Sequence, residues 1–281
     1  MATVRGKLDF LPISVWHLKK SKYWADKIRD TGDIEKTRRS SNCKHLPNLK
    51  YSEFNPDVAQ RVILFWSNKN ELIVDPFAGR STRAVVSMYL NRNYQGYEIA
   101  PKTYEEMLSK IKKVPKSKDI GSAEIFLDDG CKMNQTNNNE ADLVFTCPPY
   151  HQLEKYESVD NQLSDIRDYD KFLDRIKECS KNIFRVLKPG RFCVWVVADW
   201  RLNGFKCFHK DSIDIFQESG FKLWDIVINQ LNSPFPSFQI RKCYKNCYTS
   251  KSHEYILVFK KEGENEFPLR DNVELDIDKW L

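Results

Sequence analysis

The chain has 281 residues, of which 41% are hydrophobic and 13% aromatic. This is enough for one sizeable core and too little for two large ones, so we expect one principal domain with elaborations. No apolar run is long enough to cross a bilayer, and the first residues lack the apolar stretch of a secretory signal. These features predict a cytoplasmic protein, whose eight cysteines are reduced thiols rather than a disulfide framework.

The net charge is +6, and it is unevenly distributed along the chain. Residues 1–50 carry twelve Lys/Arg against five Asp/Glu, and residues 230–261 carry six against one. Residues 262–281 carry seven acidic residues against two basic ones. We therefore divide the chain into a basic, aromatic extension (1–55), a main domain (56–261) and an acidic tail (262–281).

The pattern after residue 55 alternates between buried strands and amphipathic helices. Residues 1–55 are expected to be irregular, as are the polar loop 151–168 and the basic, aromatic loop 231–252, and a Lys-Pro-Gly turn is expected at 188–190. Helices are expected over 56–67, 80–90, 101–113, 169–187 and 208–219. Strands are expected over 71–79, 93–100, 123–129, 142–150, 191–201, 220–230 and 253–261. This alternation predicts a doubly wound α/β domain with seven strands and helices on both faces.

Ligands of such sheets bind at the carboxyl ends of the strands, so the residues that end each strand are candidate site residues. The first strand ends in the turn Asp75–Gly79, where Gly79 allows a close backbone approach. Glu98 ends the second strand, at the place where a carboxylate accepts hydrogen bonds from ribose hydroxyls. Asp128 and Asp129 end the third, and we select Asp129 to accept from an adenine amino group. Together they predict a nucleoside pocket, and the absence of GxGxxG disfavours a nicotinamide-dependent oxidoreductase.

The fourth strand ends in the run Thr146-Cys147-Pro148-Pro149-Tyr150. With the turn Asp75-Pro76-Phe77-Ala78-Gly79, it resembles the DNA amino-methyltransferases, which methylate adenine N6 or cytosine N4. That family has an FxG turn and a motif of Asp, Asn or Ser, then Pro-Pro and an aromatic residue. The turn precedes the Pro-Pro motif, as in the alpha and gamma subgroups, and the resemblance covers roughly residues 45–261.

The resemblance implies a class I S-adenosylmethionine-dependent methyltransferase fold, with a Rossmann-like sheet that ends in a reversed hairpin (220–261). It implies methyl transfer to a base rotated out of double-stranded DNA, in a bacterium or a phage-infected host, and it allows for a cognate restriction nuclease. It implies that the N-terminal extension (1–55) packs on the cofactor side of the domain. It implies catalytic roles for Cys147, Pro148, Pro149 and Tyr150. It implies cofactor contacts from Asp75, Phe77, Ala78, Gly79, Thr82, Glu98, Ile99, Asp129 and Thr146.

The chemistry gives these residues a physical reason. An exocyclic amino nitrogen is a poor nucleophile because its lone pair is delocalised into the ring. Acceptors that hold its N–H groups out of plane raise its electron density before the transition state is reached. In the family, the first motif side chain and the carbonyl of the first proline, here Cys147 and Pro148, are those acceptors. Tyr150 would stack on the flipped base, and no metal is required.

The chain departs from the family at two positions. Cys147 replaces an oxygen-bearing residue, and sulfur is a weak acceptor. Either the Pro148 carbonyl accepts most of the hydrogen bonding from the amino group, or Thr146 assists, or the chain is a weak or inactive methylase. In the family, serine at the first motif position accompanies a cytosine target, and Cys147 resembles serine. Motif order and Asp129 do not favour cytosine, so adenine is preferred as the target base. Ser81 stands where many relatives have a second glycine, which a helix N-terminus tolerates.

Phosphate neutralisation and base stacking favour DNA contacts by the loop 231–252. The loop 151–168 is also expected to contact DNA and to close over the target base. The residues expected to contact DNA are Arg80, Phe238, Arg241, Lys242, Lys245 and Lys251. The rival functions are an RNA or protein amino-methyltransferase and a non-catalytic nucleic-acid-binding module. A zinc site among Cys43, His45, Cys243, Cys247 and His253 has no CxxC pair to support it, so no metal is expected.

Overall fold

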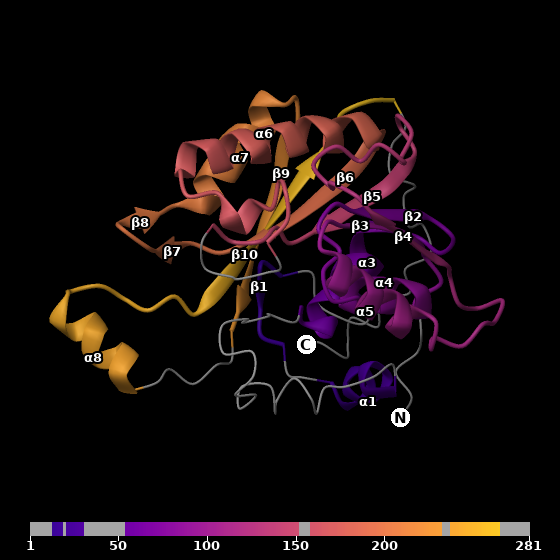
Figure 1. Cartoon of the computed structure of the whole chain (residues 1–281), viewed down its shortest axis with the longest axis horizontal. Helices are drawn as coiled ribbons and strands as arrows, with labels where there is room; N and C mark the ends of the chain where they lie inside the picture. Colours follow the sequence, from indigo (N-terminus) through magenta and orange to yellow (C-terminus); the bar gives the residue numbers. More distant parts are fainter. Residues whose placement is uncertain (1–12, 19–20, 31–53, 152–157, 232–236, 265–281) are drawn as a thin grey trace.

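The computed structural model describes residues 13–18, 21–30, 54–151, 158–231 and 237–264. Its centre is an eight-stranded sheet in the order β1-β9-β10-β6-β5-β2-β3-β4 (Figure 1). The strands are β1 (Val15–Trp16), β2 (Leu72–Asp75), β3 (Asn93–Glu98), β4 (Ala123–Leu127), β5 (Ala141–Thr146), β6 (Leu187–Val197), β9 (Lys222–Gln230) and β10 (His253–Lys260). β10 runs antiparallel to both of its neighbours, and the other neighbouring strands pair in parallel. The mostly parallel sheet and the reversed hairpin expected from the sequence are confirmed.

The eighth strand, β1, lies in the region where irregular structure was expected. It is only two residues long and pairs with β9 through Val15↔Ile228 and Trp16↔Asn229. Its Trp16 side chain is buried and lies 6.3 Å from the ring of Trp66. A strand this short has no periodic pattern, so only the pairing with β9 defines it.

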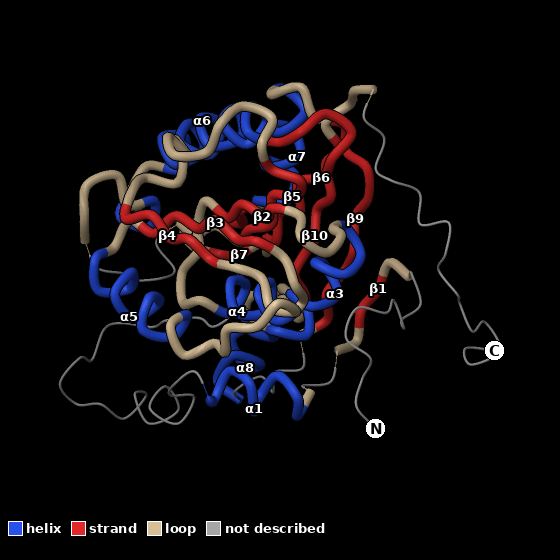
Figure 2. The backbone as a smooth tube through the Cα atoms, turned by 90° about the vertical axis from the view of Figure 1, so that its right-hand side faces the viewer, coloured by secondary structure: helices blue, strands red, loops and turns tan. Residues whose placement is uncertain are grey.

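Two helical layers cover the sheet (Figure 2). One layer holds α3 (Pro56–Trp66), α4 (Thr82–Tyr89) and α5 (Pro101–Ile111), with α1 (Lys22–Asp30) on its outer side, and the other holds α6 (Tyr169–Val186) and α7 (Phe208–Glu218). Successive side chains of β5 pack toward opposite helical layers. Phe145 belongs to the core beneath α3 and α4, and Val144 belongs to the core beneath α6. This follows from the period of two along a strand and explains the continuously apolar sequence of β5.

The described part of the N-terminal extension packs on α3 and α4. Trp24 on α1 is fully buried, with its ring 6.3 Å from that of Tyr89 and its Nε1 donating to Gln60. The extension was expected to be irregular, and this helix is a correction. Of the acidic tail, only residues 262–264 lie inside the described chain.

Three further boundaries differ from the sequence expectation. Residues 188–190 form no separate turn but belong to β6, where the register shifts between the Ala141↔Leu187 and Leu143↔Phe192 pairs. The expected strand 191–201 divides, and its end forms a separate hairpin of β7 (Trp200–Arg201) and β8 (Phe205–Lys206). The loops expected over 231–252 and 151–168 contain α8 (Ser237–Lys245) and the short helix η1 (Leu163–Asp165). Short or bulged elements form by pairing with distant segments of the chain. The periodicity of side chains along the sequence carries no information about that pairing.

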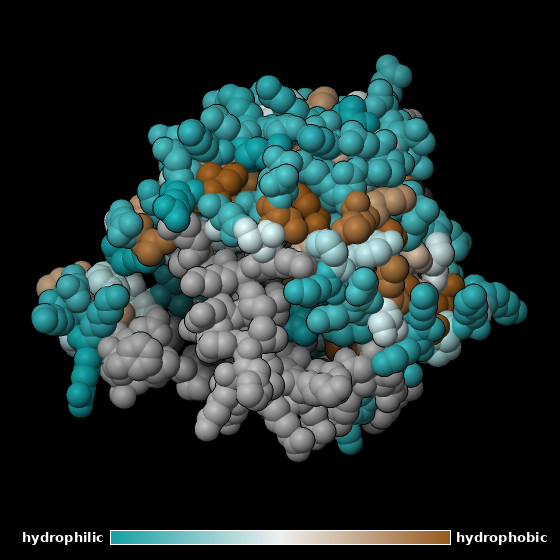
Figure 3. Space-filling model, in the orientation of Figure 1, coloured by the Kyte–Doolittle hydropathy of each residue, from teal (hydrophilic) through white to brown (hydrophobic). Residues whose placement is uncertain are grey.

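Among the described helices, no membrane-spanning candidate is found. The outer surface of α6 and α7 is hydrophilic, with apolar side chains gathered in a band below it (Figure 3).

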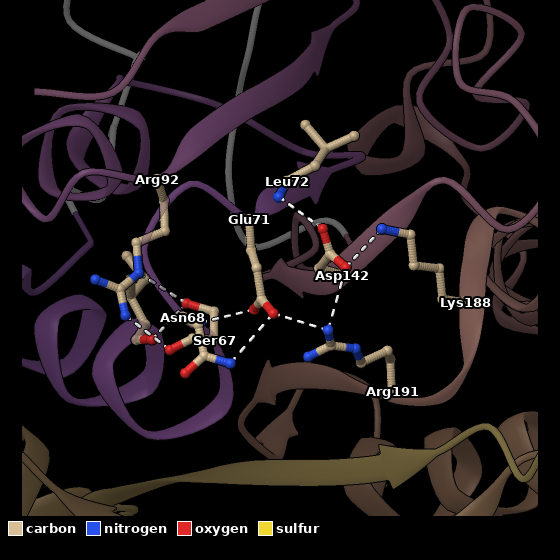
Figure 4. A network of polar contacts seen from close by, with 9 residues as sticks. Ser67, Asn68, Glu71, Leu72, Arg92, Asp142, Lys188 and Arg191 are labelled. Carbon is tan, nitrogen blue, oxygen red and sulfur yellow. Dashed lines mark hydrogen bonds and ion pairs between the residues drawn. The ribbon is translucent and has the colours of Figure 1, made fainter. Parts of the chain in front are cut away.

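A polar network ties the amino ends of the central strands together (Figure 4). Arg191 Nη2 lies 2.7 Å from Glu71 Oε1 and 3.4 Å from Asp142 Oδ1. Asp142 also accepts from the backbone N–H of Leu72 and pairs with Lys188 at 2.6 Å. These contacts join β2, β5 and β6 at the edge of the sheet from which those strands start.

Arg191→Met is expected to lower the free energy of unfolding by about 2–3 kcal/mol, because two nearly buried carboxylates lose their shared cation. Urea denaturation measures the change. The matched control is Lys177→Met, whose partner Glu218 and own side chain are 58% and 43% exposed. This variant should lose much less stability than Arg191→Met, because solvent screens an exposed ion pair. Equal losses in the two variants would contradict a structural role for the network.

Candidate active site

An open cavity of about 520 Å³ lies at the carboxyl ends of β2, β3, β4 and β5. This is the edge at which parallel α/β sheets bind ligands. The cavity is lined by Pro76, Phe77, Gly79, Tyr97, Glu98, Ile99, Asp129, Gly130, Cys131, Cys147, Pro149, Asn161, Gln162 and Leu163. It therefore brings together Gly79, Glu98 and Asp129 of the predicted nucleoside pocket and two residues of the Pro-Pro motif.

The turn after β2 is held against the neighbouring strand ends. The backbone N–H of Ala78 donates to the Tyr97 carbonyl at 2.9 Å, and Gly79 adopts a positive φ of 58°. Ala78 itself is buried and does not line the cavity. A Cβ on Gly130 would stand 1.7 Å from the Pro76 carbonyl oxygen, so only glycine fits after β4. Gly130 was not predicted as a site residue, although its place directly after Asp128 and Asp129 was a signal.

Asp75, expected among the cofactor-binding residues, is fully buried and does not line the cavity. Its Oδ1 accepts from the backbone N–H of Phe77 at 3.0 Å and from the Thr146 hydroxyl at 2.6 Å. Its Oδ2 accepts from Tyr94 at 2.7 Å and pairs with Arg83 at 2.5 Å. The carboxylate is therefore the centre of a buried network that joins β2, β3, α4 and β5.

Two other expected cofactor residues are also buried and do not line the cavity. Thr146 is fully buried with its hydroxyl on Asp75, and Thr82, the first residue of α4, is buried and does not line the cavity. Ser81 precedes α4 with φ 75°, and its side chain does not cap the helix. The Ser81 hydroxyl donates to the Arg80 carbonyl oxygen. The positive φ gives a physical reason why glycine suits this position.

Glu98 lines the cavity and is mostly buried. Its Oε1 accepts from the backbone N–H of Ala100 at 2.8 Å. Burial raises the pKa of Glu98 to about 7, against the opposing effect of backbone N–H groups at Ala100, Gly79 and Ile99. A carboxyl group with this pKa changes its charge near neutral pH. Ligand groups that donate hydrogen bonds to it stabilise its charged form.

The structure separates the two aspartates after β4. Asp129 lines the cavity, with Oδ1 on the Cys131 N–H at 3.0 Å and Oδ2 on Arg175 at 2.8 Å. Asp128 bonds to Gln135 and does not line the cavity. Of this pair, Asp129 is therefore the one placed to meet a ligand.

The Pro-Pro motif divides between the cavity and the core. Cys147 and Pro149 line the cavity, whereas Pro148 is buried. Tyr150 is half-buried, with its ring edge-on to Trp200 at 5.6 Å. Cys147 and Pro149 therefore border the same space as the strand-end carboxylates Glu98 and Asp129.

The segment after the motif is held at both ends. His151 is buried, its Nε2 lies 3.1 Å from the Arg167 carbonyl oxygen, and its ring packs 5.3 Å from that of Phe172. Burial lowers the pKa of His151. Residues 161–163 then return to the cavity wall, a contribution that no pattern in the sequence indicated. Residues 152–157, within the predicted closing loop, lie outside the described chain.

The expected DNA contacts fall in two separate places. Arg80 is largely buried and lies 3.9 Å from Glu106 on α5, away from the loop 231–252. Arg241, Lys242 and Lys245 are exposed on α8, and the Lys251 ammonium lies 4.9 Å from the Phe205 ring centroid. Phe238 lies on α8, but its side chain is outside the described residues.

Within the described part of the chain, one group of side chains has the composition of a metal site: Asp199, Cys207 and His209. His209 Nδ1 lies 2.8 Å from Asp199 Oδ1, and the His209 N–H donates to the same oxygen at 3.2 Å. Asp199 thus already has a role, because it binds the first turn of α7 twice. Cys43 and His45 lie outside the described residues.

The fold is that of S-adenosylmethionine-dependent methyltransferases. A solved methyltransferase of this class from Methanosarcina mazei superposes with a TM-score of 0.50 at 11% identity, covering 72% of this chain and 98% of that one. The DNA methylase family profile matches residues 12–110 and 141–280. The chain therefore belongs to the N6/N4 DNA methylase family.

Two curated relatives agree with this assignment. The type II methyltransferase M.MthZI of Methanothermobacter thermautotrophicus is 25% identical over 170 residues, which are 54% of this chain and 48% of the relative. The orphan methyltransferase M.BamHII of Bacillus amyloliquefaciens is 30% identical over 122 residues, 43% of this chain and 38% of the relative. The chain matches about half of each relative or less.

Proposed function

We propose that this protein transfers a methyl group from S-adenosylmethionine to the exocyclic amino group of adenine or cytosine in DNA. The observation that carries the proposal is the shared cavity, in which Glu98 and Asp129 stand with Cys147 and Pro149. A nucleoside-binding edge and an amino-group acceptor motif that line one cavity fit methyl transfer between two ligands held side by side.

The residues present fit S-adenosylmethionine. The cavity combines apolar walls with a few carboxylates, as small-ligand sites do. Glu98 would accept hydrogen bonds from ribose hydroxyls and Asp129 from the adenine amino group. Phe77, Ile99 and Leu163 supply apolar walls. When bound, this molecule supplies the methyl group on a positively charged sulfur.

The chain's own residues would act on the target amino group by position. The Pro148 carbonyl and the Cys147 side chain would accept its N–H groups and draw the nitrogen lone pair out of conjugation. Proline lacks an N–H and has a fixed φ, so the motif backbone is rigid. Thr146 donates its hydroxyl to Asp75, so its contribution would be to hold the strand end in place. Tyr150, supported by Trp200, would stack on the flipped base.

The direct test is transfer from labelled S-adenosylmethionine to unmethylated DNA, with the product identified by nucleoside mass spectrometry. N6-methyladenine or N4-methylcytosine supports the proposal and names the base. Cofactor binding without transfer to DNA would contradict it and direct attention to RNA and protein acceptors or to a binding module. A partner nuclease is a separate proposal, because the relatives include both a type II methyltransferase and an orphan methyltransferase.

Cys147→Ser is expected to raise the rate of methyl transfer about tenfold, because a hydroxyl oxygen is a better acceptor than a thiol sulfur. Affinity for S-adenosylmethionine should stay within about twofold, since the change affects the amino-group side of the site. The control is Cys247→Ser, an exposed thiol outside the cavity. A lower rate in Cys147→Ser than in the control would contradict an acceptor role for this side chain.

A further inference from the structure

The β7–β8 hairpin lies beside the Pro-Pro motif. It follows β6 at the carboxyl edge of the sheet, and Trp200 on β7 contacts Tyr150. On β8, the Lys206 ammonium lies 4.3 Å from the ring centroid of Tyr169, the first residue of α6. The hairpin and α8 lie on the same side of the molecule (Figure 1). The hairpin therefore borders the predicted base-binding region, a position that the sequence analysis did not identify.

Two segments on this side carry only positive charge. Residues 200–206 and 237–252 together contain six basic residues and no Asp or Glu. We call these six residues the basic rim: Arg201, Lys206, Arg241, Lys242, Lys245 and Lys251. The ion pairs found across the described chain include no member of the rim. By contrast, Arg83, Arg175 and Arg191 each pair with a carboxylate.

Arg201 joins the hairpin to the segment after α8. Its guanidinium lies 4.9 Å from the Phe205 ring centroid and 4.6 Å from that of Tyr248. Lys251 contacts the Phe205 ring as well. Stacking uses the faces of the guanidinium and leaves its N–H donors, which lie in the plane, free to point outward. A planar donor group held on aromatic rings is preorganised for a phosphate.

We propose that the basic rim binds the phosphodiester backbone of DNA beside the target base, with Arg201 and Lys206 as the contacts nearest the Pro-Pro motif. This inference rests on the proposed function. Unpaired positive charge next to a base-binding site favours a polyanion, and rings among the cations favour a nucleic acid over a simple anion. The surface of α8 is mainly hydrophilic, as such a contact requires (Figure 3).

The test compares DNA binding by Arg201→Ala/Lys206→Ala with binding by the wild-type protein over a range of salt concentrations. The probe is a linear unmethylated duplex with a fluorescent label. Loss of two phosphate contacts should reduce the slope of log K against log salt by about two, with at least tenfold weaker binding near 0.1 M salt. The matched control is Lys116→Ala/Lys118→Ala, two exposed lysines before β4, at the opposite edge of the sheet.

A second readout checks that the variant is folded. Affinity for S-adenosylmethionine and the thermal midpoint should match those of the wild type, and Lys242→Ala/Lys245→Ala on α8 should show the same change in slope. If both rim variants bind DNA like the control while the wild type binds and methylates DNA, this inference fails and the proposed function stands. If the wild-type protein binds no duplex and methylates none, both fail together.

Discussion

Glu98→Gln is expected to weaken S-adenosylmethionine binding about 100-fold and to stabilise the free protein. The carboxylate would accept two charge-assisted hydrogen bonds from ribose hydroxyls, each contributing about 1.5–3 kcal/mol, and a neutral amide accepts them more weakly. Glutamine still provides an oxygen for the Ala100 N–H, so the local backbone is retained. Calorimetric titration with S-adenosylmethionine measures the change in affinity.

The pKa of Glu98 gives this prediction its pH dependence. Because burial raises that pKa to about 7, the ligand-binding carboxylate is lost as pH falls through 7, and affinity should drop about tenfold per unit below it. In the free protein the sign is opposite. The raised pKa favours the folded state below the unfolded value near 4.3, and this contribution disappears as pH rises through 7. Glutamine avoids that penalty, so at pH 8 the variant should be about 2 kcal/mol more stable.

Glu105→Gln, an exposed carboxylate on α5, is the control and should change neither quantity. A Glu98→Gln protein that binds S-adenosylmethionine with wild-type affinity at pH 8 would remove Glu98 from the cofactor site. If Glu98→Gln keeps the full pH dependence of S-adenosylmethionine affinity, another ionisable group is responsible for that dependence.

Asp75→Ala is expected to lower the free energy of unfolding by about 3–5 kcal/mol, because it leaves the Arg83 guanidinium buried without its carboxylate. Arg83 is 5% exposed and also donates to the Phe77 carbonyl. Burial alone would lower the pKa of Arg83, but Asp75 holds it above its usual value. Cofactor affinity should fall with the loss of structure, since Asp75 supports the Phe77 turn without lining the cavity. Urea denaturation with and without S-adenosylmethionine measures both effects.

A double variant distinguishes an unpaired charge from a simple loss of contacts. Asp75→Ala/Arg83→Met removes both charges, and it should be about 1–3 kcal/mol more stable than the sum of the two single variants predicts. Additive losses would mean that the two side chains act independently. Asp75→Ala and Glu98→Gln thus differ in kind: the first should lose both stability and cofactor affinity, and the second should lose affinity while gaining stability.

The position of the site was predictable from the sequence because it depends on local pattern. Strand periodicity locates the carboxyl end of each strand, and in a parallel sheet these ends meet at one edge. Gly79, Glu98, Asp129 and Cys147 follow such ends, and the structure brings them to one cavity. Asp75 follows the same rule of position, but it is turned inward by Arg83, eight residues further along the chain. An arginine inside the apolar helix 80–90 was the signal that could have revealed this partner.

The pattern of side chains predicts the alternation of strands and helices, the parallel sheet and the edge that holds the candidate site, because these features depend on periodicity and on residues within one turn or strand. The reversed last strand was expected only from the resemblance to the family. The tertiary structure decided which strand-end carboxylates face the cavity, the pairing of β1 with β9, the need for glycine at 130 and the meeting of Arg201 with Tyr248. Each of these depends on a contact between segments far apart in the chain, whose energy no local pattern encodes.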